Sequence, residues 1–401
     1  MWSYLRDAVE VAVLCVIAFA QWRMAGAALD WAARRRSEVL ANLVRFLVWA
    51  VGAGLIGAAV LMALGRHWIV GTLPLTPEAR GWIRGAAYLW AFNSTGVYLI
   101  YRLWRWPLDH WVSPSFTPSR RRLLRAAGTA AMTAPVAVTG FGVFIQRTDF
   151  RVREVDVPIP NLPPDLEGWR LLQISDVHLG IFLSEREFAR VIDAGRELRP
   201  HLVLATGDFI SEPTDPLYSC LRQIARLRPE AGVFGCMGNH EAYASVEEGA
   251  AELGAGLGIR MLRREAQALK AGSATLNLVG VDHQSVKQRS NYLKGVEALL
   301  TPGAVNVLLS HNPDVFPVAA KMGFDLTVSG HTHGGQISVE ILRKGLNPAR
   351  FVTPFTYGRY ARGRASLYVT RGVGTIGLPV RFGAPPEIAL LRLRSAPSGH
   401  A

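Results

Sequence analysis

The chain has 401 residues, of which 50% are hydrophobic and 19% are charged, and its formal net charge at pH 7 is +13. A chain of this length can form two or three domains, and its hydrophobic content is high for a purely soluble protein. The basic excess does not indicate nucleic-acid binding, because no stretch combines basic and aromatic residues as a recognition module does.

Basic charge and tryptophan are concentrated in the first part of the chain. Residues 1–150 contain 16 arginines, no lysine and 7 acidic residues, a balance of +9, whereas the rest contains 28 basic and 24 acidic residues, a balance of +4. Ten of the 11 tryptophans also lie before residue 150. Arginine and tryptophan beside apolar stretches mark membrane interfaces. We therefore expect a transmembrane region of about four helices over residues 1–147 and a second domain over residues 148–397.

Four stretches of the first region have the apolarity expected of membrane spans, with buried helices of a soluble protein as the alternative. They are residues 11–22, 46–64, 85–101 and 126–145. The first and third loops between them carry more arginines than the second. Because arginine-rich loops stay in the cytoplasm, we expect a multi-pass protein of the plasma (inner) membrane whose second domain lies on the extracytoplasmic face. Residues 119–125 (SRRRLLR) also resemble a twin-arginine export motif, with an ordinary arginine-rich anchor as the alternative.

After residue 147 the pattern becomes that of a soluble α/β domain. Residues 151–160 alternate apolar and polar side chains, which predicts a strand. Apolar runs then recur at 171–174, 202–205, 232–236, 276–281, 305–309, 326–328, 367–370 and 388–393, and helix-like stretches lie at 185–198, 217–227 and 245–257. Strands that alternate with helices predict a parallel or mixed sheet covered by helices. The later runs have fewer helices between them, which indicates a second sheet and a layered sandwich.

The three cysteines do not predict a structural zinc site, because no CxxC pair is present. Cys15 falls in the first predicted span. Cys220 and Cys236 could form a disulfide in an oxidising compartment. The alternative is that Cys236, on an apolar run, is a small buried residue.

Seven potential metal ligands follow the apolar runs of the second domain. They are Asp176 and His178 in SDVH, Asp208 in TGD, Asn239 in GNH, His311 in LSH, and His331 and His333 in GHTH. Loops at the carboxyl ends of strands in an open α/β sheet converge on one crevice, so we expect the seven to meet. Carboxylate, imidazole and amide donors suit manganese, iron or zinc. The two-residue spacing in DVH predicts an extended backbone that points Asp176 and His178 the same way.

The blocks DVH, GD, GNHE, SH and GHTHGGQ, in this order over residues 165–395, resemble the calcineurin-like metallophosphoesterase superfamily. The tail RGVGTIGLPVRFGAPPEI resembles its branch of membrane-associated or exported bacterial phosphoesterases, some of which act on lipid-linked substrates such as UDP-diacylglucosamine. The resemblance implies a sandwich of two mixed β-sheets flanked by helices. It does not extend to the four predicted spans.

The resemblance also implies a role for each site residue. One metal ion would be bound by Asp176, His178 and His333, the other by Asn239, His311 and His331, and Asp208 would bridge both, together with a water or hydroxide. His240 would not be a ligand but would lie near the leaving group or the phosphoryl oxygens, as a general acid or a hydrogen-bonding stabiliser.

Physical reasoning supports the same chemistry. Two ions about 3.5–4 Å apart can clamp the attacking and leaving oxygens of a displacement and lower the pKa of a shared water. Two carboxylates leave such a site positive, which favours an anionic substrate. We expect a membrane-anchored phosphoesterase that hydrolyses phosphomonoester, phosphodiester or pyrophosphate bonds. Lipid-linked molecules are its candidate substrates. The alternatives are a phosphodiesterase for soluble nucleotides and a non-enzymatic metal-binding membrane sensor.

Three further residues stand near the ligand blocks. His283 in GVDHQ is either close to the site or structural. Arg381 is either a phosphate contact or part of a salt bridge at the surface or a sheet edge. Glu241 is expected to orient the neighbouring backbone or a ligand.

Overall fold

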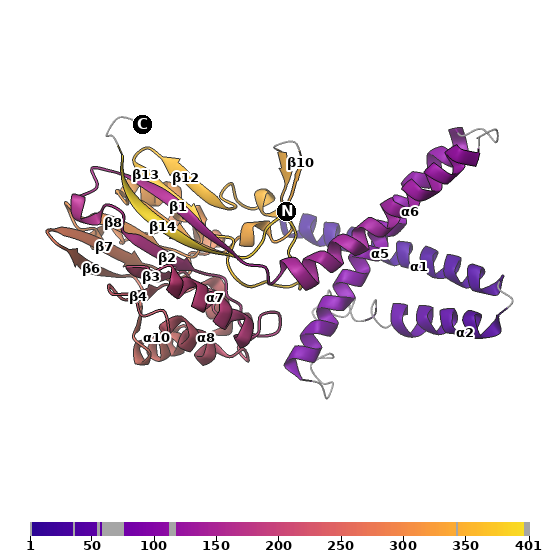
Figure 1. Ribbon diagram of the computed structural model, residues 1–401, viewed down its shortest axis with the longest axis horizontal. Coiled ribbons are helices and arrows are strands. Elements are labelled where there is room, and N and C mark those ends of the chain that lie inside the picture. Colours follow the sequence, from indigo (N-terminus) through magenta and orange to yellow (C-terminus); the bar gives the residue numbers. More distant parts are fainter. Residues whose placement is uncertain are drawn as a thin grey trace. The chain divides into compact units, whose positions relative to one another are not determined.

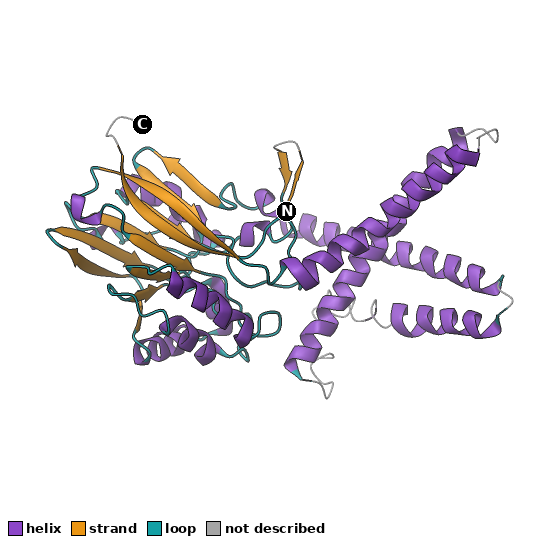
Figure 2. Cartoon of the chain, in the orientation of Figure 1, coloured by secondary structure: helices purple, strands orange, loops and turns teal. Residues whose placement is uncertain are grey.

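The computed structural model describes residues 2–34, 37–53, 57, 76–111, 118–341 and 344–396 (Figure 1). Its residue contacts divide the chain into two compact units, Met1–Phe141 and Gly142–Ala401. The first unit is helical, whereas the second combines strands and helices (Figure 2).

The helices of the first unit pack in pairs. α1 (Trp2–Ala33) contacts α2 (Glu38–Phe46) and α5 (Pro77–Trp111), and α5 contacts α6 (Pro118–Phe141). A π-helical segment, η1 (Leu47–Ala53), continues α2. A second π-helical segment, η2 (Gly142–Gln146), continues α6 into the second unit.

Polar side chains of α5 face the neighbouring helices. The buried Ser94 hydroxyl accepts a hydrogen bond from Gln21 of α1, and the Asn93 side chain accepts one from the Thr139 hydroxyl of α6 at 2.9 Å. Large apolar side chains are instead exposed, among them Phe19, Trp22, Phe92, Leu103 and Val136. A soluble helix bundle buries its apolar stripe. Polar groups between helices and apolar groups outside are typical of helices in lipid.

Among the described residues, one helix is long and apolar enough to cross a membrane, Arg122–Gln146. It contains the predicted span at 126–145. The predicted spans at 11–22 and 85–101 lie within α1 and α5. Most of the predicted span at 46–64 falls outside the described residues.

The second unit contains two six-stranded mixed sheets and a hairpin. In order, the first sheet has β1 (Arg151–Pro160), β14 (Glu387–Ala396), β2 (Arg170–Ile174), β3 (Leu202–Ala205), β4 (Val233–Gly235) and β5 (Ile259–Met261). The second has β12 (Gly358–Arg362), β13 (Ala365–Val369), β9 (Leu326–Ser329), β8 (Val305–Leu309), β7 (Ala274–Gly280) and β6 (Glu265–Ala271). The hairpin joins β10 (Val339–Ile341) to β11 (Lys344–Leu346). Four strands run parallel in each sheet, β2 to β5 in the first and β7, β8, β9 and β13 in the second.

Apolar side chains fill the space between the two sheets and the space under the helices. β2, β3, β8, β9 and β13 are buried on both faces, which explains why most of their residues are apolar and why their few polar side chains are buried as well. The outer face of the first sheet packs against α7 (Glu185–Glu197), α8 (Leu217–Ala225) and α10 (Glu247–Gly256). α7 begins with a capping box in which Ser184 and Glu187 exchange hydrogen bonds, and it buries Phe188, Val191 and Ile192 on one side.

Shorter helices lie in the loops. They are η3 (Pro164–Leu166), α9 (Asn239–Ala244), η4 (Val286–Asn291), η5 (Glu297–Leu299), η6 (Pro313–Val315), α11 (Phe316–Met322), η7 (His333–Gly335) and η8 (Pro348–Phe351). Phe316 of α11 packs beside buried residues of β13.

The two mixed sheets flanked by helices confirm the predicted fold class. The predicted strands at 151–160 and 202–205 match β1 and β3 residue for residue. The strands that sequence reasoning missed in these sheets, β5, β6 and β12, all lie at a sheet edge. β6 buries one residue and β12 none, and β5 has only three residues, so none of them shows a long apolar run. Cys220 and Cys236 are buried and free, so no disulfide joins them.

Candidate metal centre

Predicted ligands from both sheets come close together at the carboxyl ends of the strands. The loops follow the carboxyl ends of β2, β3 and β4 in the first sheet and of β8 and β9 in the second, and they carry the predicted ligands Asp176, His178, Asp208, Asn239, His311, His331 and His333. Six of these seven fall in groups whose donor atoms lie within 4.8 Å of one another. Asn239 begins α9 beside His240, whose backbone N–H donates to Asp208 at 2.9 Å.

The backbone at the centre is left-handed at most of these positions. Positive φ angles occur at Asp176 (50°), His178 (44°), Asp208 (54°), His331 (75°) and His333 (51°). The predicted extended DVH backbone is therefore wrong, because left-handed backbone conformations at both residues, not strand geometry, set the directions of Asp176 and His178. A non-glycine residue in this region costs about 1–2 kcal/mol, and such strain clusters at functional sites.

Two glycines let the loops approach closely enough. A Cβ atom on Gly330 would lie 2.2 Å from Asp176 Oδ2, and one on Gly238 would lie 2.1 Å from Asp208 Oδ1. Any side chain at either position would displace a carboxylate.

Asp176, His178 and His333 form the first group. His178 Nε2 lies 3.2 Å from His333 Nε2, and His333 Nε2 lies 3.5 Å from Asp176 Oδ1. His178 Nδ1 is 3.1 Å from the Ile210 carbonyl, which can only accept, so Nδ1 carries the proton and Nε2 has a free lone pair. A histidine that donates its other ring nitrogen to a carbonyl is oriented as metal ligands are.

Asp208, His311 and His331 form the second group. His311 Nδ1 donates to the Thr206 carbonyl at 2.7 Å, and His311 Nε2 lies 3.0 Å from Asp208 Oδ2. The same oxygen lies 3.6 Å from His178 Nε2 of the first group. One carboxylate oxygen of Asp208 therefore faces both groups.

Two buried oxygen atoms that could bind a metal ion have no hydrogen-bond partner in the protein. Among the described residues at this centre, they are Asp176 Oδ2 and Asn239 Oδ1. Buried polar atoms are otherwise almost always hydrogen-bonded, so these two indicate that something else binds them. Carboxylate, amide and imidazole donors fit two divalent cations that share Asp208.

Comparison with known proteins agrees with this centre. Residues 170–335 match the family model described as calcineurin-like phosphoesterase. An uncharacterised metallophosphoesterase of Aquifex aeolicus (strain VF5) is 30% identical over 252 residues, which are 61% of this chain and 92% of that protein. The chain belongs to the calcineurin-like metallophosphoesterase family. This family is dimetal-dependent.

Two other relatives extend the similarity. "Transmembrane protein with metallophosphoesterase domain" of Danio rerio is 29% identical over 278 residues, 66% of this chain and 62% of that protein. "Phosphodiesterase YaeI" of Escherichia coli (strain K12) is 28% identical over 281 residues, 69% of this chain and 99% of that protein. The chain thus spans less than two thirds of the zebrafish relative and nearly all of the bacterial one.

Burial and mutual charge set the protonation of this metallophosphoesterase centre. Burial lowers the pKa of His178 and of His331 to about 3, so both rings are neutral and able to bind a cation. Burial also lowers the pKa of His311, but the adjacent Asp208 carboxylate outweighs it and raises that pKa to about 10. Burial would raise the pKa of Asp208, yet His311, His178 and His240 hold it well below its usual range. Without a metal ion, Asp208 and His311 therefore form a buried ion pair.

Glu241 joins two of the ligand loops. Its buried carboxylate accepts backbone N–H groups from Asp208 (2.9 Å), Phe209 (2.8 Å) and Gly238 (2.8 Å). It therefore orients the backbone and does not face the metal ligands.

Arg381 is neither a phosphate contact nor part of a surface salt bridge, in contrast to both expectations. Its side chain is fully buried, and it donates to the carbonyls of Arg371 (2.8 Å), Ala384 (3.1 Å) and Gly374 (2.9 Å). Arg381 Nη2 also lies 3.1 Å from His333 Nδ1. Arg381 Nη1 also donates to the backbone carbonyl of His333 at 3.4 Å, so the guanidinium contacts this residue at two points.

The loop that Arg381 holds also supports Asp176. The backbone N–H of Gly374 donates to the Asp176 carbonyl at 2.7 Å, and that of Val373 donates to the Ser175 carbonyl at 3.1 Å. Arg381 thus organises His333 and Asp176, two of the three members of the first group. No sequence pattern indicated this role, because most partners of Arg381 are backbone carbonyls.

Three residues lie at the edge of the centre. His240 Nδ1 donates to the Ser211 carbonyl at 2.9 Å, and its ring lies 4.8 Å from that of His178. Tyr243, 73% exposed, lies 5.7 Å from the ring of His240 and 6.5 Å from that of His283. The ring of His283 is 6.2 Å from that of His331, so His283 lies beside the site. Tyr243 was missed by sequence reasoning, although it follows His240 by one turn of α9.

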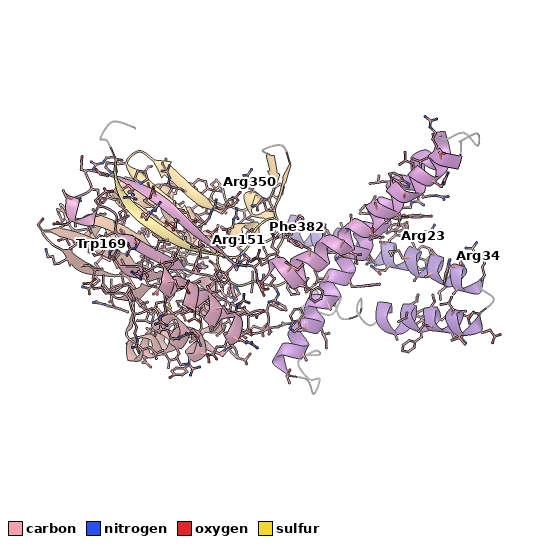
Figure 3. The ribbon with its side chains drawn as sticks, in the orientation of Figure 1. Arg23, Arg34, Arg151, Trp169, Arg350 and Phe382 are labelled. Carbon is pink, nitrogen blue, oxygen red and sulfur yellow. The ribbon has the colours of Figure 1, made fainter. Side chains whose placement is uncertain are left out.

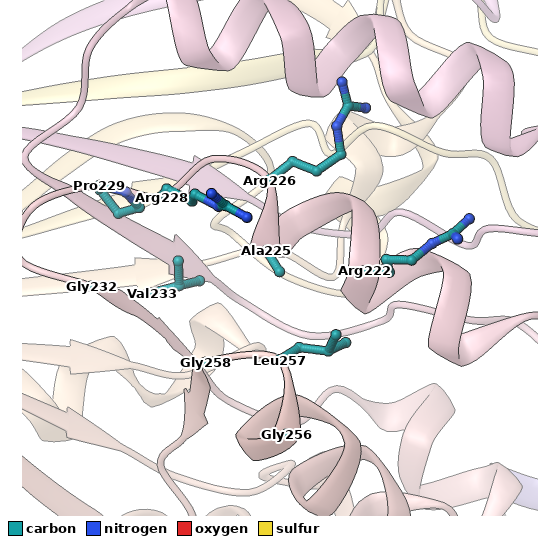
Figure 4. Close-up of a pocket in the computed structure, with 10 residues that line it drawn as sticks. All are labelled: Arg222, Ala225, Arg226, Arg228, Pro229, Gly232, Val233, Gly256, Leu257 and Gly258. Atoms are coloured by element: carbon teal, nitrogen blue, oxygen red, sulfur yellow. The ribbon is translucent and has the colours of Figure 1, made fainter.

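A separate cavity of about 510 Å³ lies at the amino ends of β4 and β5, at the opposite end of these strands from the metal loops (Figure 4). Two of its arginines are engaged elsewhere, Arg222 with Glu185 at 2.6 Å and Arg226 with Asp193 at 2.5 Å. The carboxyl ends of α8 and α10 also point to it, and they disfavour anions. The metal centre remains the better candidate for chemistry.

Metal binding should release a proton at His311. Asp208 raises the pKa of this ring to about 10, whereas a histidine that binds a metal ion must have lost that proton. The apparent affinity for the ion at Asp208, His311 and His331 should therefore rise between pH 7 and pH 9. A weakly buffered protein solution should also acidify when a divalent ion is added. Calorimetric titration in buffers of different ionisation enthalpy measures both effects, with His201→Gln as a control away from the centre. A constant affinity over this range would contradict the assignment.

Replacement of Arg381 should weaken the binding of one metal ion and leave the binding of the other unchanged. In Arg381→Gln and Arg381→Lys, the ion at Asp176, His178 and His333 should lose about 10- to 100-fold in affinity, as is usual when a group that orients a ligand is removed. Competition with a chelator and metal analysis should then give one tightly held ion per chain. Arg392→Gln, a substitution on β14, is the matched control, and thermal unfolding reports folding. Equal loss of both ions, or tighter binding after removal of the positive charge, would refute this role.

Proposed function

We propose that this chain is a membrane-anchored, binuclear metal-dependent phosphoesterase that hydrolyses phosphomonoester, phosphodiester or pyrophosphate bonds. The observation that carries the proposal is the position of Asp208 Oδ2, which lies 3.0 Å from His311 Nε2 and 3.6 Å from His178 Nε2. A carboxylate oxygen that faces two groups of imidazole and carboxylate side chains is suited to a pair of cations.

We propose the ligand assignment that the family resemblance implies, and two of the side-chain groups support it. One cation would be held by Asp176, His178 and His333, the other by Asn239, His311 and His331, and both by Asp208. The donor set suits manganese, iron or zinc. When bound, the two cations would supply a hydroxide nucleophile at neutral pH and stabilise the charge on the phosphoryl oxygens. Because Asp176 and Asp208 bring only two negative charges, the loaded centre would attract an anionic phosphate.

His240 is suited to donate a proton to the leaving group. Its Nδ1–H is engaged with the Ser211 carbonyl, and its ring stands edge-on to that of His178. Nε2 is then the ring nitrogen that can carry a second proton and donate it to a departing alkoxide.

Three observations support membrane anchoring. Helix Arg122–Gln146 has the length and apolarity of a span, and the first unit places polar groups between its helices and apolar groups outside. The zebrafish relative is named as a transmembrane protein. The distribution of arginine between the loops favours several passes, with the second unit on the extracytoplasmic face. An anchored centre near a bilayer is suited to lipid-linked substrates.

A soluble nucleotide is the second candidate, and Tyr243 favours it. An exposed ring beside the centre offers a face on which a base can stack. Turnover of a lipid-linked pyrophosphate and of a nucleotide diester by the same preparation, with protein retained in membranes, separates the two candidates.

Replacement of the shared carboxylate should abolish catalysis. In Asp208→Ala both cations lose a ligand, so hydrolysis of an aryl phosphodiester with added manganese should fall by roughly 10³-fold or more. Asp193→Ala, on an exposed part of α7, is the control and should match the unmodified protein. Equal activity of the two variants would exclude the binuclear mechanism.

Replacement of His240 should discriminate between leaving groups. Without a proton donor, His240→Gln should lose about 10²- to 10⁴-fold on an alkyl phosphodiester but far less on a 4-nitrophenyl ester, whose leaving group needs no proton. Rates on both substrates should be compared at equal metal content, so that a loss of ions is not mistaken for a loss of acid catalysis. The same fold-loss on both esters would rule out this role.

A further inference from the structure

The segment after the His333 turn returns to the metal centre at both of its ends. Asn347, which follows β11, is buried, and its side chain donates to the Gly334 carbonyl at 3.0 Å. Farther along, the Thr356 carbonyl accepts a hydrogen bond from the Thr332 hydroxyl at 2.5 Å. Residues 348–355 are therefore held close to the ligand turn that carries His331 and His333.

The middle of this segment projects apolar side chains into solvent. Phe351 is 92% exposed and Val352 is 69% exposed, and the neighbouring Arg350 is exposed as well. Scattered exposed apolar residues are ordinary in proteins. Two adjacent exposed apolar side chains beside a functional centre, in a segment held by hydrogen bonds at both ends, indicate a surface that binds something else.

A second exposed apolar pair lies near the start of this unit. Phe144 is 79% exposed and Ile145 is 55% exposed, and both belong to η2, the last turns of the candidate span. Gln146, next in the chain, accepts the backbone N–H of Gly383 at 2.8 Å. The η2 segment is thus fastened to residues 381–383.

Backbone pairing connects the two pairs. Ile337 bridges Phe382 and Gly383, and the N–H of Ser338 donates to the Phe382 carbonyl at 2.7 Å. Ser338 leads directly into β10, and the hairpin returns the chain to Asn347. Figure 3 shows Arg350 and Phe382 near this hairpin. The strip formed by residues 336–338 and 381–383 therefore lies between the two exposed apolar pairs.

We propose that Phe144, Ile145, Arg350, Phe351 and Val352 form a docking edge that inserts into the surface of a lipid bilayer and holds the metal centre at the level of the headgroups. The proposal rests on the membrane anchoring proposed above. A bilayer is the occupant that the chain itself brings to this edge, because η2 is the end of its candidate span. Apolar side chains beside a cation suit an interface in which rings enter the acyl boundary and the guanidinium binds lipid phosphate.

The test measures the depth of residue 351 in the bilayer. Phe351→Cys, in a Cys15→Ser background of the full chain, is spin-labelled and reconstituted into vesicles of phosphatidylethanolamine and phosphatidylglycerol. Cys220 and Cys236 are buried, so they compete little for the label. Tyr218→Cys, an exposed position on α8, is the matched control. Collisions with oxygen, which partitions into lipid, are compared with collisions with a water-soluble nickel complex.

The docking edge predicts that the label at residue 351 collides preferentially with oxygen and the label at residue 218 with nickel. Preferential nickel collisions at residue 351 would overturn the proposal, and so would protection from both reagents, which indicates a protein partner. The readout does not require turnover: loss of docking with intact aryl phosphodiester hydrolysis refutes this edge alone, whereas docking without hydrolysis of any ester refutes the proposed function.

A second variant links docking to substrate access. Phe351→Ser combined with Val352→Ser should lower kcat/KM on a lipid-linked phosphodiester in vesicles by about tenfold or more, because two apolar anchors are lost. The same variant should retain its rate on a soluble aryl ester. Equal losses on both substrates would indicate damage to the centre and contradict the proposal.

Discussion

The metal centre depends on the burial of one carboxylate, that of Asp208. A buried carboxylate is tolerated only when cations or hydrogen-bond donors compensate its charge. Here His311 faces Oδ2 at 3.0 Å and the His240 N–H donates to Oδ1 at 2.9 Å. Each of these partners comes from a different loop, so the compensation of one charge draws the loops together. The carboxylate of Glu241 then ties the backbone of this loop to that of the Gly238 turn.

The rest of the second unit serves to hold strained loops in place. Five of the seven predicted ligands adopt left-handed backbone conformations, which L-amino acids avoid. Such turns persist only when the surrounding structure over-determines them. The strands that precede them are buried on both faces between the sheets and the helices, and their carboxyl ends are therefore fixed. On the side of the first group, the buried guanidinium of Arg381 completes the support by binding the carbonyls of the opposite loop.

Much of this organisation could be read from the sequence, and the exceptions have physical causes. Long apolar runs identified the central strands, because burial on both faces demands them, and the polar residues after them identified the ligand loops. The edge strands β5, β6 and β12 were missed because an edge needs few apolar residues. The turn at Asp176 and His178 was taken for extended chain, since periodicity does not report the sign of φ. Arg381 was singled out, but its role was not predicted, because its partners are mostly backbone carbonyls. Tyr243 was not singled out at all. Ligand spacing is visible in a sequence, but the groups that orient the ligands are not.

The separation of the two metal ions is the most direct test of this account. Anomalous diffraction from crystals of the metal-loaded chain would locate each ion relative to Asp208 without reference to activity. The account predicts two peaks about 3.5–4 Å apart on either side of that carboxylate. A single fully occupied site, or two sites too far apart to share Asp208, would contradict it.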